Sequence, residues 1–391
     1  MEINYLSKKI GIIGGGQLGK MMINEASKLG ISTAILDPGI DCPASPLANE
    51  AIVAAFNDKA ALEELAKKTD VLTCEFEHIS TEALKYLEDH GYIVYPKAKS
   101  LEAIQNKYQQ KKLLQDNSIP LGPFKKADST ESIKAAAAEY GYPLMVKSAS
   151  GAYDGKGNYL VTSEEEISEA YSSLNGDENL LYVEQFIPFT KEISVLCCRT
   201  MNGEIVVYPV AENIHRDSIL YETIAPANIT DKQTQDAEKL AKEICHMFDG
   251  VGMFCVEMFV HENGDILVNE VAPRPHNSGH YTIEACITSQ FENHVRAVLG
   301  LPLGKTDLHS PVVMRNLLGE DGHEGIPLVK GVSEALAYPG LTLHIYGKST
   351  TKPQRKMGHF TVLAKTVEEA LSTADQAQSV LKIISEKTPK G

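Results

Sequence analysis

The chain has 391 residues, of which 43% are apolar and 23% charged, a composition typical of a soluble globular protein with two or three domains. Its 37 Lys and Arg residues are outnumbered by 52 Asp and Glu residues, so the formal net charge is −15. This charge argues against a general binding surface for nucleic acid or for an anionic membrane, and any phosphate must be bound by local cations and backbone amides.

Seven cysteines occur without a C-x-x-C pair or the Cys/His spacing of a zinc site, which indicates reduced thiols. The N-terminal segment lacks the apolar stretch of a signal peptide, and no apolar run approaches the length of a membrane span. We therefore expect a cytoplasmic protein with no nucleic-acid and no membrane partner.

The N-terminal part alternates strand and helix signals and predicts a small parallel α/β domain over residues 1–105, with a last strand at residues 93–95. A buried strand leads into the glycine turn Gly14-Gly-Gly-Gln-Leu-Gly19, which opens an amphipathic helix, and the next strand ends at Asp37, 18 positions after Gly19. This pattern fits the dinucleotide-binding fingerprint, so a nicotinamide-dependent oxidoreductase is one hypothesis. The same turn serves any Rossmann-like half that directs a helix N-terminus toward an anion, which leaves the ligand open.

An acidic cluster, Glu75-Phe-Glu77-His78, lies at the carboxyl end of a predicted strand that begins at Val71. Ligands bind at this edge of open α/β sheets, which makes Glu75 a candidate site residue. The alternative is an acidic cluster that caps the helix beginning near Ser80.

A glycine-rich segment, Ser148 to Asn158, lies between the strand Pro143–Lys147 and a strand at residues 159–161. A Walker A loop leads into a helix, so the order strand, glycine loop, strand instead suits a hairpin flap whose amides close over phosphates. Lys147 lies on the buried strand beneath this flap, and a buried lysine is costly unless it is paired. A phosphate ligand is the favoured role for Lys147, and an accidental core position is the alternative.

Two apolar runs flank Asn263-Gly264, the strongest short signal for a two-residue type I′ hairpin. Counting outward from this turn places Glu257 directly opposite Glu270, where like charges about 4.5–5.5 Å apart repel each other. Among apolar neighbours the pair requires a shared proton or a cation, and oxygen ligands suit Mg²⁺. The alternative is an acidic pair at a rim, neutralised by a nearby Lys or Arg.

A single helix is expected from His280 to about Leu299, and a small α/β unit follows the linker Gly300-Leu-Pro-Leu-Gly304. A basic loop between two strands of this unit is unusual in so acidic a protein. It carries Lys348, Arg355 and Lys356. An anion site is one interpretation of this loop, and a solubilising turn is the other.

These motifs together resemble ATP-grasp enzymes, and among them the 5-(carboxyamino)imidazole ribonucleotide synthetases of purine biosynthesis. The most specific matches are the run from Asn269 to His280 and Arg355-Lys-Met-Gly-His359. The similarity extends nearly end to end and includes Gly14–Gly19, Glu75–Glu77, Tyr153-Asp-Gly-Lys-Gly157, Glu212-Asn-x-His215 and Thr288-Ser-Gln-Phe-Glu292.

The resemblance implies a fold of the α/β and α+β classes in three parts. These are a Rossmann-like domain at residues 1–105, an ATP-grasp domain at residues 106–300 with its flap at residues 148–160, and a C-terminal cap domain at residues 301–391. It implies ATP and one or two Mg²⁺ ions as cofactors, and neither NAD nor biotin. It also implies aminoimidazole ribonucleotide and bicarbonate as substrates and a homodimer as the assembly.

The resemblance also implies the site residues. ATP would contact Lys107, Lys147, the flap residues Ala152, Tyr153, Asp154, Gly155, Lys156, Gly157 and Asn158, the hinge residues Glu184, Gln185, Phe186 and Ile187, and Glu192, His215, Asn269 and Glu270. The ribonucleotide would contact Gln17, Leu18, Glu75, Asp154, Arg274, Lys348, Arg355 and Lys356. Glu257 and Glu270 would hold Mg²⁺, and the catalytic candidates are Tyr153, Asp154, His215 and Arg274.

The implied reaction is an ATP-driven carboxylation of an amine through carboxyphosphate. Other hypotheses are another ATP-grasp ligase acting on a ribonucleotide, such as a formate-dependent formyltransferase, the NAD enzyme, and a non-catalytic ATP-binding regulator. The regulator is disfavoured because the flap and both metal carboxylates are present. The chain departs from the usual family pattern at three positions, Lys107 in place of Arg, and Ala152 and Gln354 each in place of Gly.

Overall fold

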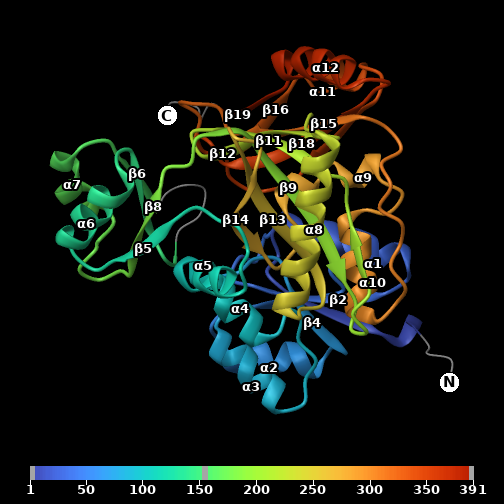
Figure 1. The fold of residues 1–391 in the computed structure, drawn as a ribbon. Coiled ribbons are helices and arrows are strands. Elements are labelled where there is room, and N and C mark those ends of the chain that lie inside the picture. The colour runs from blue at the N-terminus through green and yellow to red at the C-terminus, as the bar shows by residue number, and fades with distance from the viewer. Residues whose placement is uncertain (1–4, 152–156, 387–391) are drawn as a thin grey trace, which may run out of the picture.

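The computed structural model describes residues 5–151 and 157–386, and the strands of these residues form a parallel sheet near the N-terminus, a small sheet, a nine-stranded sheet and a two-stranded sheet. Figure 1 shows the small sheet standing apart from the nine-stranded sheet, with the N-terminal sheet below the latter. Within this part of the chain, no helix is long and apolar enough to cross a membrane.

The N-terminal sheet has the strand order β3-β2-β1-β4, and the registers among these four strands are parallel. Its strands are β1 (Lys9–Ile13), β2 (Ser32–Asp37), β3 (Glu50–Val53) and β4 (Val71–Cys74), and its helices are α1 (Gln17–Lys28), α2 (Lys59–Lys67), α3 (Thr81–Asp89) and α4 (Ala98–Gln105). The central strand β1 is apolar and buried nearly throughout, as a parallel strand covered on both faces requires. The strand predicted at residues 93–95 is reduced to one bridge between Leu72 and Val94.

The small sheet has the order β5-β8-β6-β7 and is antiparallel. Its strands are β5 (Phe124–Ala127), β6 (Leu144–Ser148), β7 (Asn158–Val161) and β8 (Leu181–Gln185), with α6 (Thr130–Tyr140), the short η2 (Glu164–Glu166) and α7 (Ile167–Ser173) beside them. Buried residues of α6 and α7, among them Ile133 and Ile167, pack on Leu144 and Val183 of the sheet. The predicted hairpin of two strands around the glycine-rich segment is confirmed, because β6 pairs with β7.

The nine-stranded sheet has the order β14-β13-β9-β11-β12-β15-β18-β17, with β10 beside β9. Its strands are β9 (Phe189–Arg199), β10 (Ile205–Val207), β11 (Ala211–Arg216), β12 (Ile219–Ala225), β13 (Gly252–His261), β14 (Ile266–Ala272), β15 (Val312–Leu318), β17 (Leu341–Ile345) and β18 (Lys356–Leu363). The amphipathic helix α8 (Asp231–Phe248) buries Ala241, Ile244 and Phe248 against it, and Thr230 and Gln233 form a capping box at its start. Because β12 pairs with β15, the sheet continues across the linker expected at residues 300–304.

The prediction of a single helix from His280 to Leu299 is wrong, because the segment contains two helices, α9 (Thr282–Ala285) and α10 (Gln290–Leu299). The short η3 (Asn277–Gly279) precedes this segment. Cys286 ends α9 in an extended conformation, and the Ser289 side chain accepts a hydrogen bond from Glu292 N to start α10.

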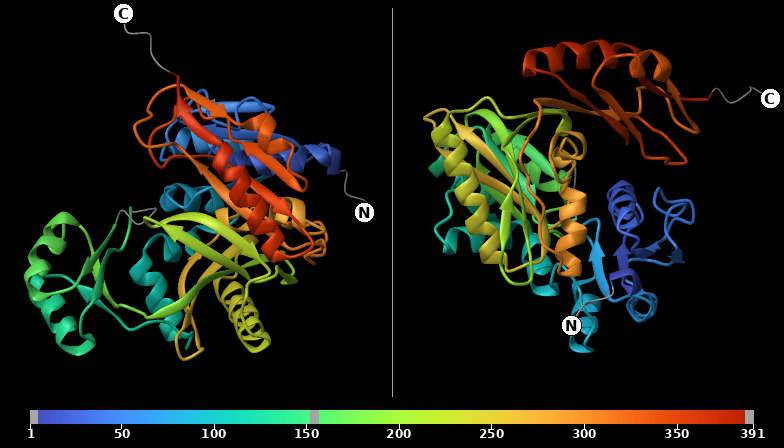
Figure 2. Two further views of the ribbon diagram at one scale, coloured as in Figure 1. Left: turned by 90° about the horizontal axis from the view of Figure 1, so that it is seen from above. Right: turned by 90° about the vertical axis from the view of Figure 1, so that its right-hand side faces the viewer.

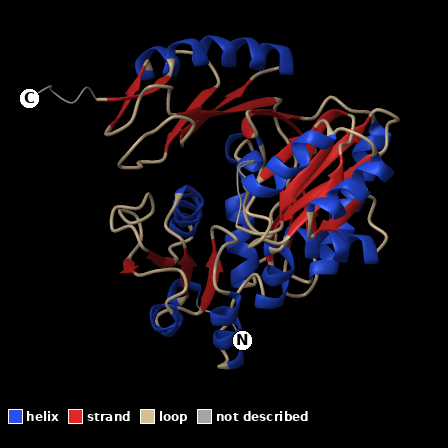
Figure 3. Cartoon of the chain, turned by 90° about the vertical axis from the view of Figure 1, so that its left-hand side faces the viewer, coloured by secondary structure: helices blue, strands red, loops and turns tan. Residues whose placement is uncertain are grey.

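The C-terminal part completes the fold around the far end of the large sheet. Its remaining elements are β16 (Pro327–Lys330), α11 (Val332–Leu336), α12 (Val367–Val380) and β19 (Lys382–Ser385), and η1 (Tyr5–Ser7) precedes β1. Figure 3 shows the C-terminal helices on the outer face of their strands. In Figure 2 these elements lie beside the N-terminal domain, and Lys20 Nζ of α1 donates to Tyr346 O at 3.0 Å.

The hairpin of β13 and β14 reaches its register by a route that the sequence did not predict. His261 N donates to Asp265 O at 2.9 Å, so three residues form the loop, and only Gly264 among them has a positive φ, of 93°. A two-residue type I′ turn needs positive φ at both of its central residues, so that prediction is wrong. A bulge at Asn269 then shifts the register by one residue, and Glu257 pairs with Glu270 as predicted.

Candidate active site

The two sheets of the central part meet at a buried carboxylate that two lysines share. Glu184 on β8 forms an ion pair with Lys147 of the neighbouring strand β6 at 2.5 Å and with Lys111 of α5 (Lys107–Asp116) at 2.6 Å. Burial alone would raise the pKa of the Glu184 carboxyl, but the two ammonium groups lower it to about 2. The carboxylate is therefore ionised.

The predicted acidic pair lies on adjacent strands at the edge of the large sheet. Glu270 accepts a hydrogen bond from Lys107 Nζ at 2.9 Å, while Glu257 lies 3.3 Å from Nε2 of His276. Burial, and next the charge of Glu270, raise the pKa of Glu257 to about 7. This pair needs a cation or a proton to be stable at neutral pH.

The donors of the acidic pair suit a hard divalent cation. Mg²⁺ is commonly coordinated by one or two carboxylates of a protein, and substrate phosphates and water complete its coordination shell. Among residues 5–151 and 157–386, no group of three or more His, Cys, Asp or Glu side chains is arranged to hold a metal ion. Glu257 and Glu270 thus fit Mg²⁺ together with a phosphate ligand, and they do not form a closed site made by the protein alone.

Two histidines line the same region with opposite tendencies. His215 on β11 lies 3.0 Å from the Glu192 carboxylate on β9; burial lowers the pKa of this histidine, but Glu192 outweighs burial and raises it. His276 has a pKa well below its usual range because burial and the charges of Arg274 and Lys356 disfavour its cationic form. Its Nδ1 contacts the Ser278 hydroxyl at 2.9 Å. The cationic form is therefore favoured in His215 and disfavoured in His276.

The acidic cluster predicted after β4 divides between two partners. Glu77 forms an ion pair with Arg274 at 2.7 Å. Burial raises the pKa of Glu77, but the Arg274 guanidinium outweighs burial, so the pKa is lowered. Glu75 instead accepts hydrogen bonds from Gly16 N at 2.5 Å and Gly19 N at 2.8 Å. The anion site at the start of α1 is therefore filled by a carboxylate of the protein itself.

The basic loop between β17 and β18 lies next to the start of α1. Lys348 Nζ donates to Lys356 O at 2.7 Å, and Arg355 donates to the Thr350 carbonyl at 2.8 Å. Gln354 has a φ of 63°, in the left-handed region that favours glycine. Lys356 is close enough for its charge to act on His215 and His276, so the loop and the acidic pair belong to one neighbourhood.

Other predicted residues occupy less direct positions. Gln17 begins α1. The Leu18 side chain is buried in the core, so a ligand would contact only the backbone of Leu18. Gln185 ends β8, and Phe186 and Ile187 lead from the small sheet into β9, as expected of a hinge. Gly157 O accepts from Ser148 N at 2.8 Å and Asn158 pairs with Lys147. The remaining flap residues, Ala152, Tyr153, Asp154, Gly155 and Lys156, lie outside the described residues.

Three residues at the site were not on the predicted set, namely Lys20, Lys111 and His276. Lys111 could have been found from its spacing, because positions four apart lie on the same face of a helix and Lys107 was predicted. His276 lies within the specific Asn269–His280 run. Lys20 had no sequence signal beyond its place on α1.

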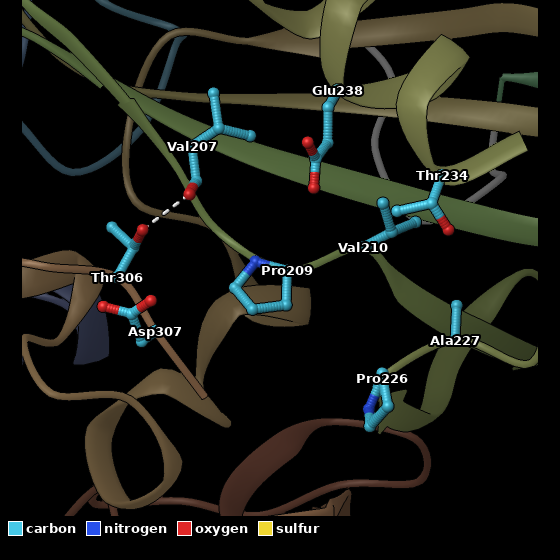
Figure 4. A pocket seen from close by; sticks show the side chains of 9 residues that line it. All are labelled: Val207, Pro209, Val210, Pro226, Ala227, Thr234, Glu238, Thr306 and Asp307. Carbon is cyan, nitrogen blue, oxygen red and sulfur yellow. Dashed lines mark hydrogen bonds between the residues drawn. The ribbon is translucent and has the colours of Figure 1, made fainter. Parts of the chain in front are cut away.

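A cavity of about 250 Å³ lies elsewhere, between β10 and α8 (Figure 4). Thr306 Oγ1 donates to Val207 O at 2.6 Å on one side, and Glu238 and Thr234 of α8 face it from the other. None of the predicted site residues that the structure describes lines this cavity, so the junction of the sheets remains the candidate active site.

Three family profiles match the chain in sequence order. They are the ribonucleotide synthetase preATP-grasp domain over residues 7–105, the ATP-grasp domain over residues 112–291 and the phosphoribosylaminoimidazole carboxylase C-terminal domain over residues 312–373. The chain is 42% identical over 369 residues to the N5-carboxyaminoimidazole ribonucleotide synthase of Bacillus subtilis (strain 168), covering 94% of each. It is also 42% identical to the phosphoribosylaminoimidazole carboxylase of Ogataea methanolica, covering 93% of this chain and 68% of that longer protein.

Solved structures agree with these matches. The N5-carboxyaminoimidazole ribonucleotide synthetase of Thermotoga maritima superposes with a TM-score of 0.89 at 46% identity, covering 97% of this chain and 100% of that chain. The Aspergillus clavatus synthase in complex with ADP and 5-aminoimidazole ribonucleotide gives a TM-score of 0.89 at 35% identity, covering 96% and 98%.

The fold and the junction of lysines and glutamates define an ATP-grasp carbon–nitrogen ligase, and the predicted fold class is confirmed. The chain carries the Rossmann-like preATP-grasp part and the characteristic C-terminal part on either side of the ATP-grasp domain. It belongs to the N5-carboxyaminoimidazole ribonucleotide synthase family.

Proposed function

We propose that this protein uses ATP and bicarbonate to carboxylate the exocyclic amine of aminoimidazole ribonucleotide, a step of purine biosynthesis. The observation that carries the proposal is the junction of the two sheets, where Lys147 pairs with Glu184 and Lys107 pairs with Glu270, the strand partner of Glu257. The Aspergillus clavatus relative binds ADP and this ribonucleotide together, which supports the same pair of ligands here.

ATP binds between the small and the large sheet in this proposal. Lys107 and Lys147 contact its phosphates, the segment 184–187 its base, and the flap closes over it. Glu257 and Glu270 hold one or two Mg²⁺ ions, which supply positive charge to the transferring phosphoryl group when bound. Phosphoryl transfer depends chiefly on positioning and on neutralising developing charge, which cations around a water-poor site provide.

Bicarbonate attacks the γ-phosphorus of ATP to give carboxyphosphate and ADP, and carboxyphosphate breaks down to CO₂ and phosphate. The amine of the ribonucleotide captures CO₂ and loses a proton. Tyr153, Asp154, His215 and Arg274 are the proposed residues around the reacting carbon. The site must exclude water while carboxyphosphate exists, which is the role of the flap and of the C-terminal part.

The ribonucleotide lies between the start of α1 and the basic loop. Gln17, Glu75 and Arg274 contact the base and ribose side, and Lys348, Arg355 and Lys356 hold the 5′-phosphate. The contact of Lys20 with Tyr346 O supports this placement, because it brings α1 and the loop together. The three parts 1–105, 106–300 and 301–391 act together in the cytoplasm, and we expect a homodimer.

Two rival activities make different predictions. A nicotinamide dinucleotide would need the amides of Gly16 and Gly19 for its pyrophosphate, and both already donate to Glu75. Asp37 is likewise engaged, because its carboxylate accepts hydrogen bonds from Gly15 N and Gly39 N, each at 2.8 Å. This arrangement disfavours the NAD enzyme. A formate-using ligase would share the ATP site but not the requirement for bicarbonate.

The test is ADP release by the purified protein with Mg·ATP and aminoimidazole ribonucleotide, in CO₂-depleted buffer with and without added bicarbonate. We expect release to require both the ribonucleotide and bicarbonate, and formate not to replace bicarbonate. Release driven by formate alone, or NAD binding without ATP binding, would refute the proposal.

A further inference from the structure

The helix α5, which carries Lys111, lies between the small sheet and the edge strand β14 of the large sheet (Figure 1). The Lys111 side chain is 5% exposed, and its Nζ forms an ion pair with Glu184 Oε1 at 2.6 Å and donates to Asn269 O at 3.0 Å. Lys107 occupies the same face of α5 one turn earlier and binds Glu270. The two lysines thus bind consecutive residues of β14, and the Lys111 side chain also pairs with Glu184 of the small sheet.

Two lysines pair with the single carboxylate of Glu184, so the three side chains have one positive charge in excess. Lys147 holds Oε2 of Glu184 at 2.5 Å while Lys111 holds Oε1, and the three side chains are 14%, 5% and 11% exposed for Lys147, Lys111 and Glu184. By formal charge these three side chains carry +1, which is unfavourable when buried. Burial, together with the charge of Lys147, accordingly lowers the pKa of Lys111. An anionic ligand at this junction would remove the cost.

The contact with Asn269 ties the same ammonium to the bulge of β14. Asn269 is the unpaired residue between the pairs Glu257–Glu270 and Met258–Val268. β14 is an edge strand, and the neighbouring Gln110 of α5 exchanges two hydrogen bonds of 2.9 Å with the Val271 backbone. Side chains of α5 therefore bind the outer edge of β14 at the residues that place Glu270.

We propose that Lys111 is a positioning residue for nucleotide binding. By taking one oxygen of Glu184, it prevents this carboxylate from binding Lys147 with both oxygens, so that Lys147 keeps donors and charge for a phosphate. It simultaneously fixes the small sheet relative to Asn269. The proposal rests on the ATP site of the proposed function and does not depend on which amine is carboxylated.

The first experiment compares Lys111→Met with Lys112→Met by calorimetric titration of Mg·ADP and Mg·ATP. Lys112 is the matched control, because it lies on the same helix, is half exposed and pairs only with Asp116 among the described ion pairs. Loss of a charge-assisted contact predicts nucleotide binding weaker by roughly 10-fold or more for Lys111→Met, and by less than about twofold for Lys112→Met. Affinity for aminoimidazole ribonucleotide should stay within about twofold in both.

The second experiment distinguishes positioning from general destabilisation. Lys111→Met should weaken nucleotide binding far less in a Glu184→Gln background, because Lys111 acts through this carboxylate. Lys111→Arg should restore part of the affinity and also serves as the test variant if Lys111→Met does not fold. Unchanged nucleotide affinity in a folded Lys111→Met protein, or equal losses for nucleotide and ribonucleotide in either variant, would overturn the proposal. Binding is read directly, so a failure of carboxylation would contradict the proposed reaction without deciding this comparison.

Discussion

Glu184, Glu270 and Glu77 each have a lysine or arginine in ion-pair contact, whereas Glu257 has none among the described residues. Its one ion-pair contact there is His276, whose pKa lies far below neutrality. At the scale of single residues, the demand for an added cation is therefore concentrated on Glu257.

The substitution Glu257→Gln tests this demand through stability. The folded-state pKa of about 7 lies above the ordinary value of 4.5, so the folded protein keeps a proton that the unfolded chain releases. Stability is therefore lost as pH rises from about 4.5 to about 7, by on the order of 1–3 kcal/mol. We expect Glu257→Gln to be more stable than wild type at pH 8 without ligand, and nearly equal at pH 4.5. Denaturant titrations at both pH values measure this, and a destabilised variant at pH 8 would count against it.

The basic loop allows a second prediction at this scale. Arg355→Ala removes a guanidinium that can bind a phosphate with two parallel hydrogen bonds, whereas Lys348 and Lys356 supply point charges. The KM for aminoimidazole ribonucleotide should rise by roughly 10-fold or more, while ATP affinity changes little. Binding of the dephosphorylated riboside, measured in parallel, is the control. Equal weakening of riboside and ribonucleotide would place the phosphate elsewhere.

At the scale of elements, α1 begins at an anion site that Glu75 fills. A Cβ atom added to Gly16 would lie 2.3 Å from Glu75 Oε1, so a larger residue must displace this carboxylate. The helix would then lose two hydrogen bonds to its first turn, and the ribonucleotide side of the site would lose the ordered Glu75.

Gly16→Val should therefore weaken ribonucleotide binding while leaving the distant ATP contacts intact. We expect the KM for aminoimidazole ribonucleotide to rise by roughly 10-fold and the Kd of Mg·ATP to stay within about twofold. Titrations with NAD on wild type and variant complete the experiment. Micromolar NAD binding to wild type that the valine abolishes would restore the dinucleotide hypothesis.

The sequence predicted elements well where a local pattern determines them. The strands β1 and β2 and the helix α1 follow from the local pattern, and the pairing of Glu257 with Glu270 was correct. It was correct because two departures cancel: the loop has three residues instead of two, and the bulge at Asn269 compensates. Side chains of α5 at the edge of β14 accompany this bulge, and such a long-range contact leaves no mark in the local pattern.

For the site residues, too, the local sequence pattern was informative and the long-range contacts were not. Lys107, Lys147, Glu184, Glu257 and Glu270 were expected and lie together at the junction of the sheets. The sharing of Glu184 by Lys111 was not expected, because it depends on how two sheets meet. The continuity of the large sheet into the C-terminal part was missed since β12 was not recognised between the turn at Asp217-Ser218 and Pro226.

At the scale of the whole molecule, buried histidines join the parts. Thr73 Oγ1 of β4 lies 2.7 Å from His294 Nε2 of α10, and Met253 N of β13 donates to His294 Nδ1 at 3.1 Å. His359 of β18 stacks on His344, with ring centroids 4.4 Å apart, and lies 4.6 Å from the ring of His280. The N-terminal domain and the C-terminal part are therefore both attached to the ATP-grasp core through contacts of histidine rings.

These histidines predict acid lability. Burial lowers the pKa of His294 to about 3 and places those of His276, His280 and His359 well below 6.5, so the unfolded chain binds protons that the folded chain does not. The stability from each neutral histidine is present above the unfolded pKa of about 6.5, and it is lost below this pH by about 1.4 kcal/mol per pH unit. Glu257, which binds a proton in the folded state, offsets the loss from one histidine.

Denaturant titrations between pH 7.5 and pH 5 measure this loss. His294→Gln should show a shallower dependence, by about 1.4 kcal/mol per pH unit, although it is less stable at pH 7.5. The same slope for variant and wild type would show that His294 does not contribute through its protonation.

The formation of carboxyphosphate from bicarbonate and ATP is the central claim, and the fate of bicarbonate oxygen tests it most directly. Attack of a bicarbonate oxygen on the γ-phosphorus leaves this oxygen on phosphorus when the C–O bond later breaks. With [¹⁸O]bicarbonate, Mg·ATP and aminoimidazole ribonucleotide, mass spectrometry should find one ¹⁸O in the inorganic phosphate for each turnover. Carboxylated product accompanied by unlabelled phosphate would contradict the account.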